Sequence, residues 1–118
     1  MPIVLTEVSA EEGSSFLFDI SFTDENGDTV APLQAAWTLS DMQGNVINKR
    51  EQVEILNPTG NDTVVLSGND LQLSYNADER RIFTVEALYD STELGYSIPI
   101  RNWIQFTVNN SPFPEKEI

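Results

Sequence analysis

The sequence predicts an all-β protein, built as an antiparallel β-sandwich of about seven or eight short strands. Apolar side chains alternate with other residues at a period of two along several segments, and turn residues separate those segments. No stretch keeps a helical period over three turns. The chain has 118 residues, which is one domain's length and enough to bury a core.

The alternating segments are each expected to form a strand. They are residues 16–22, 35–39, 53–55, 64–66, 83–89 and 104–108. Val65 is apolar like both its neighbours, which is consistent with burial on both faces of its strand. The alternation places the following residues in the core: Phe18, Ile20, Phe22, Trp37, Leu39, Phe83, Val85, Ile104 and Phe106.

Turn residues mark the ends of these segments. Asn26-Gly27 and Gly44-Asn45 are hairpin signals, and residues 58–62 form a third turn-like stretch. Residues 71–73 are compatible with a brief strand or a single helical turn. Residues 109–118 contain two prolines and no period, so a sandwich domain over residues 1–108 and a flexible tail over 109–118 are expected.

The composition excludes several classes of function. The chain has no cysteine and no histidine, so disulfides, Cys/His zinc sites and Ser-His-Asp or Cys-His catalysis are excluded. Its 19 acidic and 6 basic residues give a net charge of -13, which disfavours nucleic acid and anionic membranes. No targeting segment, membrane span, cofactor or enzymatic activity is expected.

Asp24, Asn26 and Asp28 have the spacing with which a calcium loop begins. The EF-hand pattern then needs glycine and a bidentate glutamate, where the chain has Thr29 and Ala35. A polar turn is therefore expected instead, with weak calcium binding left open. Adjacent acidic pairs such as Glu11-Glu12 are interpreted as solvated surface rather than acid–base machinery.

The sequence offers five interface candidates, which are Trp103, Arg80, Arg81, Phe113 and Ile118. Trp103 is out of phase with Ile104 and Phe106, so it can face outward and bind a partner. The two arginines are expected either to pair with nearby carboxylates or to dock an acidic neighbour. The N-terminal segment 3–8 and the tail 109–118, which carries Phe113, are expected to dock on neighbouring subunits.

Several segments together resemble small immunoglobulin-like or fibronectin type III-like structural proteins of tailed bacteriophages. These segments are SFLFDISFTDENGDTVAP, AAWTLSDMQGNVINKREQV, TVVLSGNDLQL and RRIFTVEALYDS. Trp37 matches the core tryptophan of immunoglobulin-like sandwiches. Phe83 stands where the penultimate strand usually opens with tyrosine, so the hydrogen bond of a tyrosine corner is absent or made by another group.

The resemblance implies a non-catalytic virion part, made in the host cytoplasm. It would serve as a head decoration, neck or tail component that binds other virion proteins in a homo- or hetero-oligomeric assembly. Contact with host-surface carbohydrate is also implied. Two alternatives stay open: a cell-surface or adhesin-type sandwich that binds carbohydrate, and a hydrolase that uses carboxylates.

Overall fold

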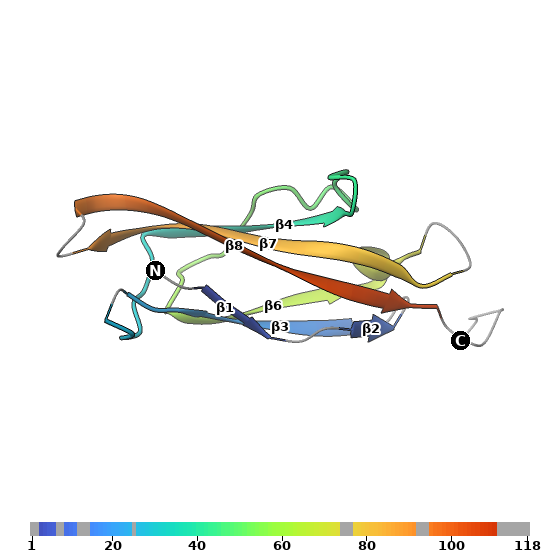
Figure 1. The fold of residues 1–118 in the computed structure, drawn as a ribbon, viewed down its shortest axis with the longest axis horizontal. Helices are drawn as coiled ribbons and strands as arrows, with labels where there is room; N and C mark the ends of the chain where they lie inside the picture. Colours follow the sequence, from blue (N-terminus) through green and yellow to red (C-terminus); the bar gives the residue numbers. More distant parts are fainter. Residues whose placement is uncertain are drawn as a thin grey trace.

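A computed structural model describes residues 3–6, 9–11, 15–24, 26–73, 77–91 and 95–110 (Figure 1). For residues 3–6, 9–11 and 91 this description is limited to the backbone. The described part is mostly β-strand and contains no α-helix, so the all-β expectation is confirmed.

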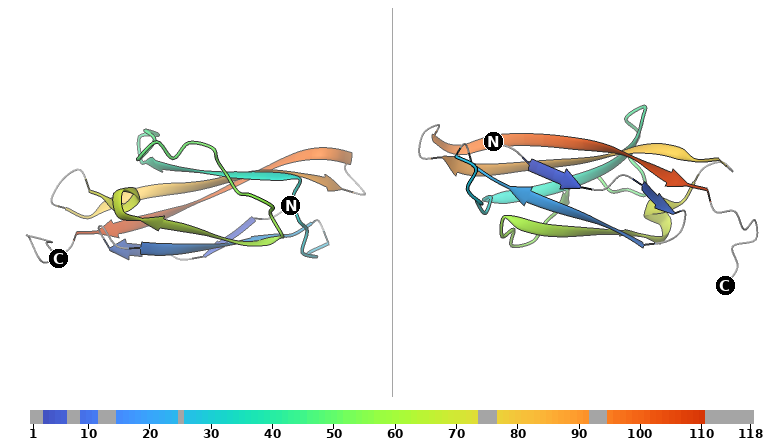
Figure 2. Two further views of the ribbon diagram at one scale, coloured as in Figure 1. Left: turned by 180° about the vertical axis from the view of Figure 1, so that it is seen from behind. Right: turned by 60° about the horizontal axis from the view of Figure 1, so that its bottom comes forward.

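The strands form two sheets that lie as two layers (Figure 2). The three-stranded sheet has the order β1-β3-β6, with β1 at Ile3–Thr6, β3 at Ser15–Phe22 and β6 at Asn61–Ser67. The five-stranded sheet has the order β2-β8-β7-β4-β5. Its strands are β2 at Ser9–Glu11, β4 at Gln34–Asp41, β5 at Val53–Glu54, β7 at Glu79–Ser91 and β8 at Gly95–Asn109.

One pairing differs from the wholly antiparallel expectation. β2 runs parallel to β8, with Ser9 opposite Thr107 and Glu11 opposite Asn109, whereas the other strand pairs are antiparallel. The chain therefore enters the three-stranded sheet as β1 and crosses to the five-stranded sheet as β2. The alternation of side chains reports which face a residue occupies and carries no information on strand direction.

The core lies between the two sheets, where the alternation predicted it. Every predicted core residue is buried except Ile104, which is partly buried and packs against the cluster. Aromatic rings bridge the layers: Phe18 of the three-stranded sheet stacks on Phe83 of the five-stranded sheet, with ring centroids 4.3 Å apart. Trp37 lies 5.5 Å from Phe83 between ring centroids, so it is a core residue as expected.

The expected two-faced burial of Val65 is wrong. Val64 and Leu66 point into the core, and Val65 is 54% exposed on the outer face of the three-stranded sheet. Its cross-strand neighbour Leu17 is exposed as well. No described segment covers that outer face, so an apolar residue placed there stays in contact with solvent.

Two of the hairpin signals form tight turns. In the first, the Asp24 carboxylate accepts the Asn26 and Asp28 amides at 2.9 and 3.0 Å. In the second, Asp41 accepts the Gln43 and Asn45 amides, each at 2.9 Å. The first turn closes a short antiparallel bridge between Thr23 and Thr29, but the strands that flank it, β3 and β4, belong to different sheets.

The ambiguous segment before β7 contributes to a 3-10 helix, η1, at Gly68–Leu71. Leu71 is buried at its end and packs in the core, as does Leu73 beyond it. From there β7 and β8 form a long antiparallel pair that runs the length of the molecule (Figure 1). Within the described residues, no helix is long and apolar enough to cross a membrane.

Candidate interaction surface

Trp103 lies on the outer face of the five-stranded sheet, away from the core. It pairs across the strands with Thr84 of β7, while Ile104 points inward beside it. The Trp103 side chain is 57% exposed. An outward tryptophan in a regular strand leaves a large apolar surface in water, and such residues are enriched at protein interfaces.

The neighbouring arginines face opposite sides of β7. Arg80 is exposed on the outer face, whereas Arg81 points into the sandwich and is 1% exposed. The Arg81 guanidinium donates to the main-chain oxygens of Asp70, at 2.8 Å, and Gln72, and forms an ion pair of 2.8 Å with Glu79. Arg81 is therefore an internal residue here, and its expected docking of an acidic neighbour does not fit this placement.

A second polar contact secures the same end of the sandwich. The buried Asp70 carboxylate accepts hydrogen bonds from Arg50 Nε at 2.7 Å, Asn48 Nδ2 at 2.8 Å and the Ser67 amide at 3.1 Å. Burial alone would raise the pKa of Asp70, but these hydrogen bonds and the Arg50 charge lower it below its usual value. The Arg50 guanidinium also lies over the Trp37 ring, 5.9 Å from its centroid.

The two end segments that were expected to pair with neighbouring subunits differ in their contacts. Within the N-terminal segment 3–8, Ile3–Thr6 form β1. This strand pairs with β3 inside the domain, so its pairing with a neighbouring subunit would require it to leave β3. Asn109 ends β8, and the Asn110 amide donates to Asp78 Oδ1 at 2.6 Å. Phe113 and Ile118 lie outside the described residues.

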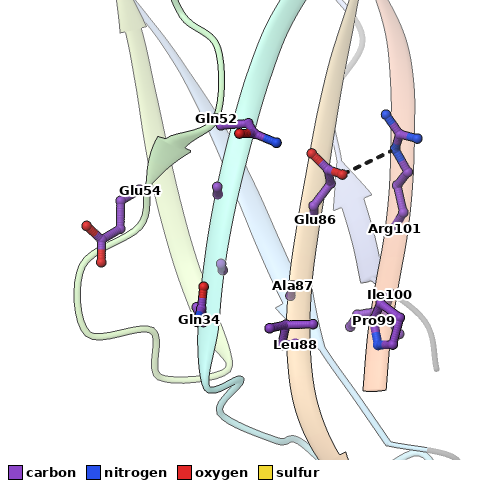
Figure 3. Close-up of a pocket in the computed structure, with 11 residues that line it drawn as sticks. Gln34, Gln52, Glu54, Glu86, Ala87, Leu88, Pro99, Ile100 and Arg101 are labelled. Carbon is purple, nitrogen blue, oxygen red and sulfur yellow. Dashed lines mark ion pairs between the residues drawn. The ribbon is translucent and has the colours of Figure 1, made fainter. Parts of the chain in front are cut away.

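A shallow hollow lies on the outer face of the same sheet, and its lining includes Arg101, two residues before Trp103 on β8. It has a volume of about 660 Å³ and runs over β5, β4, β7 and β8. Its floor is formed by small residues such as Ala36, and its polar lining comes from Gln34, Gln52, Glu54, Glu86 and Arg101. Figure 3 shows the Glu86 and Arg101 side chains turned toward each other, while Glu54 points away from them.

The hollow offers hydrogen bonds and weak charge contacts. Arg101 Nε lies 3.8 Å from Glu86 Oε2, and both side chains are exposed, so the pair contributes little to stability and stays available to a partner. Amide and carboxylate groups above an alanine floor can bind polar groups of a partner. The lining contains no pairing of a nucleophile with a base.

In the candidate calcium loop, the Asp24 carboxylate binds backbone amides of the same turn. Asp24 Oδ1 accepts two amides of the turn, which is the arrangement of an Asx turn. Among the residues that the structure describes, no three acidic side chains gather in the way that a metal site needs. The polar-turn interpretation accounts for these contacts.

Sequence reasoning missed the hollow and its lining. The alternation that placed Trp103 outward also places Glu86 and Arg101 outward, so the sequence alone indicates the side of the sheet on which they lie. That Glu54 lines the same hollow depends on the strand order β8-β7-β4-β5, which periodicity does not report. Tyr96, 85% exposed near the turn between β7 and β8, was also not singled out.

Comparison of the chain with protein-family models, with curated proteins and with solved structures finds no match.

Proposed function

We propose that this chain is a non-catalytic interaction module of immunoglobulin-like fold, and that it works as a structural or accessory part of a tailed-phage virion. It binds other virion proteins through the outer face of the five-stranded sheet. The observation that carries the proposal is the exposed, outward Trp103 on a regular sheet face that also contains a shallow hollow. Aromatic anchors surrounded by polar groups are typical of protein interfaces.

The strand order supports the immunoglobulin-like fold. In immunoglobulin lettering, β1, β3 and β6 correspond to strands A, B and E of one sheet, and β8, β7, β4 and β5 correspond to G, F, C and C′ of the other. Trp37 lies on the strand that corresponds to C and packs in the core, where these domains place their tryptophan.

Arg81 supports the same assignment. In antibody-type domains a tyrosine near the start of strand F donates a hydrogen bond to the backbone upstream, which fixes the E–F corner. Here Arg81, two residues before Phe83, donates to the main-chain oxygens of Asp70 and Gln72 in that corner. An arginine thus performs the role that tyrosine has in other domains of this class.

The virion role comes from the resemblance to phage structural proteins, and the composition agrees with it. The chain lacks the histidine and cysteine that most hydrolytic and nucleophilic sites use, so binding is the simpler function for its exposed groups. A net charge of -13 also keeps free copies soluble and directs them away from nucleic acid.

The test is to purify particles from the culture that expresses this chain and to measure its abundance by mass spectrometry. The proposal expects the chain to co-purify with the particles at a fixed ratio to the major virion proteins through a gradient. Absence of the chain from particles, or a ratio that varies between gradient fractions, would overturn it.

An alternative function is binding of carbohydrate in the outer hollow. Gln34, Gln52 and Glu54 offer planar amide and carboxylate groups of the kind that bind sugar hydroxyls. A glycan array with the purified chain tests this alternative. Binding that Gln52→Ala abolishes would favour it over a protein partner, and an array without binding would remove it.

A further inference from the structure

The central part of the outer face that β4, β5, β7 and β8 form carries no net charge, in a strongly acidic protein. The outward positions of β4, β5, β7 and β8, from the Arg80–Thr107 pair to the Leu88–Pro99 pair, carry Arg80, Arg101, Glu54 and Glu86 as their charged residues. Their formal charges cancel, while the whole chain carries -13. The other outward residues are uncharged: Gln34, Ala36, Thr38, Ser40, Ile82, Thr84, Leu88, Pro99, Trp103, Gln105 and Thr107.

A neutral face selects the kind of partner it fits. A basic partner finds its charge complement on the acidic remainder of the molecule and gains little from this face. A second copy of the chain is repelled by that remainder, and this face is where two copies can approach without like charges meeting. Neutrality together with an exposed tryptophan therefore favours a second copy over a basic protein.

The charges on β7 are complementary to themselves. Arg80 and Glu86 lie six residues apart on the same face of this strand, about 20 Å along it. Suppose that two copies face each other across a two-fold axis that lies in the plane midway between their sheets. The axis runs at right angles to the strands and passes over β7 between Ile82 and Thr84. This axis places each Arg80 opposite Glu86 of the second copy. An axis along the strands would instead place Arg80 opposite Arg80.

The same axis places the apolar and amide groups in the middle. Trp103 pairs with Thr84 and Gln105 pairs with Ile82, on either side of the axis. Each Trp103 then lies over Gln105 of the second copy, and the indole loses its contact with water. Packed β-sheets interdigitate in this way at about 10 Å separation.

We propose that two copies of this chain pack the outer faces of their five-stranded sheets against each other, with Trp103 at the centre and with reciprocal Arg80–Glu86 contacts at the two ends. This inference rests on the proposed function, because it assigns a second copy of the chain as one partner of the same outer face.

The area of the face sets the strength of the contact. The outward stretches of β7, β8 and β4 and the two residues of β5 amount to about 85 Å of strand, which at a spacing of about 4.8 Å gives about 400 Å² per copy in projection. Two copies bury about 800 Å², which is below the size of a standard stable interface and fits a weak, transient contact. The dimer is therefore weak and reversible, and it forms at the high local concentration of an assembly.

Sedimentation velocity of the purified chain over a wide range of concentration tests the proposal. The wild type should show a reversible monomer–dimer equilibrium, and Trp103→Ala should shift it to monomer. Arg80→Glu and Glu86→Arg should each be monomeric, because each places like charges opposite each other. Two off-face variants serve as matched controls, Lys49→Glu and Asp19→Arg, and both should dimerise like the wild type.

The decisive arm mixes the two charge variants. In the two-fold arrangement, the carboxylate introduced at position 80 meets the guanidinium introduced at position 86, so the equimolar mixture should form heterodimers. Their net charges become about -15 and about -11 from -13, so attraction between whole molecules cannot produce this rescue. Circular dichroism confirms that each variant is folded.

A wild type that stays monomeric at every concentration, or a mixture that stays monomeric, overturns the proposal. Failure of the proposed function is a separate result. A chain that is monomeric in solution but enters particles contradicts only the dimer, and a dimer that is absent from particles contradicts only the virion role.

Discussion

Replacement of the buried arginine Arg81 by alanine should destabilise the sandwich severely. The substitution leaves the main-chain oxygens of Asp70 and Gln72 without their donor and leaves Glu79 without its ion-pair partner. The buried Asp70 oxygen costs about 1–3 kcal/mol when it has no partner, and the oxygen of Gln72, an exposed residue, costs less. Together with the unpaired Glu79 and the cavity left by the side chain, the free energy of unfolding should fall by about 3–5 kcal/mol.

Urea unfolding, followed by tryptophan fluorescence and extrapolated to water, measures this loss. The adjacent Arg80 is the matched control, because it is the same residue type on the exposed face. Arg80→Ala should change the free energy of unfolding by no more than about 0.5 kcal/mol. Arg81→Met keeps the aliphatic stem but not the donors, so most of the loss should persist. Equal effects of Arg81→Ala and Arg80→Ala would refute the reasoning.

Three further predictions concern stability. Trp37→Ala should cost about 3–5 kcal/mol, because the ring is buried against Phe83, whereas Trp103→Ala should be nearly neutral in urea unfolding. The pKa of Asp70 is lower in the folded state than in the unfolded state, so the ionised carboxylate stabilises the fold. This stabilisation is present above about pH 4 and is lost as the pH falls through the folded-state pKa. Asp70→Asn should therefore reduce the loss of stability in acid titrations. Gly60→Ala should lower the melting temperature more than Gly27→Ala, because a Cβ at Gly60 would lie 2.7 Å from Thr29 Cγ2, whereas one at Gly27 meets nothing within 4 Å.

Each of these predictions has a clear contrary result. A Trp103→Ala loss as large as that of Trp37→Ala would contradict the outward placement of Trp103. An unchanged acid dependence in Asp70→Asn would show that the hydrogen-bonded carboxylate does not control acid stability. Equal melting temperatures of the two glycine variants would mean that strain from positive φ, which both positions share, outweighs the contact at Gly60.

Much of the core was predictable because a period of two determines which face of a strand each residue occupies. Ile104 is the exception. β2 pairs with β8 only from Thr107 to Asn109, so the edge of β8 at Ile104 has no strand beside it in the described part of the chain. The extent of an edge strand depends on pairing between distant segments, and alternation within one segment does not report it.

The candidate surface was predictable only in part. The phase of Trp103 relative to Ile104 indicated that it can face outward, and the same argument applied to Arg81 and Phe83 would have placed Arg81 inside. The neutral face is a property of four strands together. It depends on the register that brings Arg101 beside Glu86 and Ala36 beside Glu54, and this register exists only once the sheet has formed.

The most direct test of the outer face as the binding surface compares two variants with one exposed apolar residue removed from each sheet. Trp103 and Val65 are 57% and 54% exposed on opposite outer faces. Particles assembled with Trp103→Ala or with Val65→Ala as the sole source of the chain are purified, and the incorporated chain is quantified by mass spectrometry. We expect Trp103→Ala to be depleted from particles at least tenfold and Val65→Ala to be incorporated like the wild type, a difference of about 1.4 kcal/mol or more in binding. Equal incorporation of the two variants, or depletion of Val65→Ala alone, would contradict the assignment.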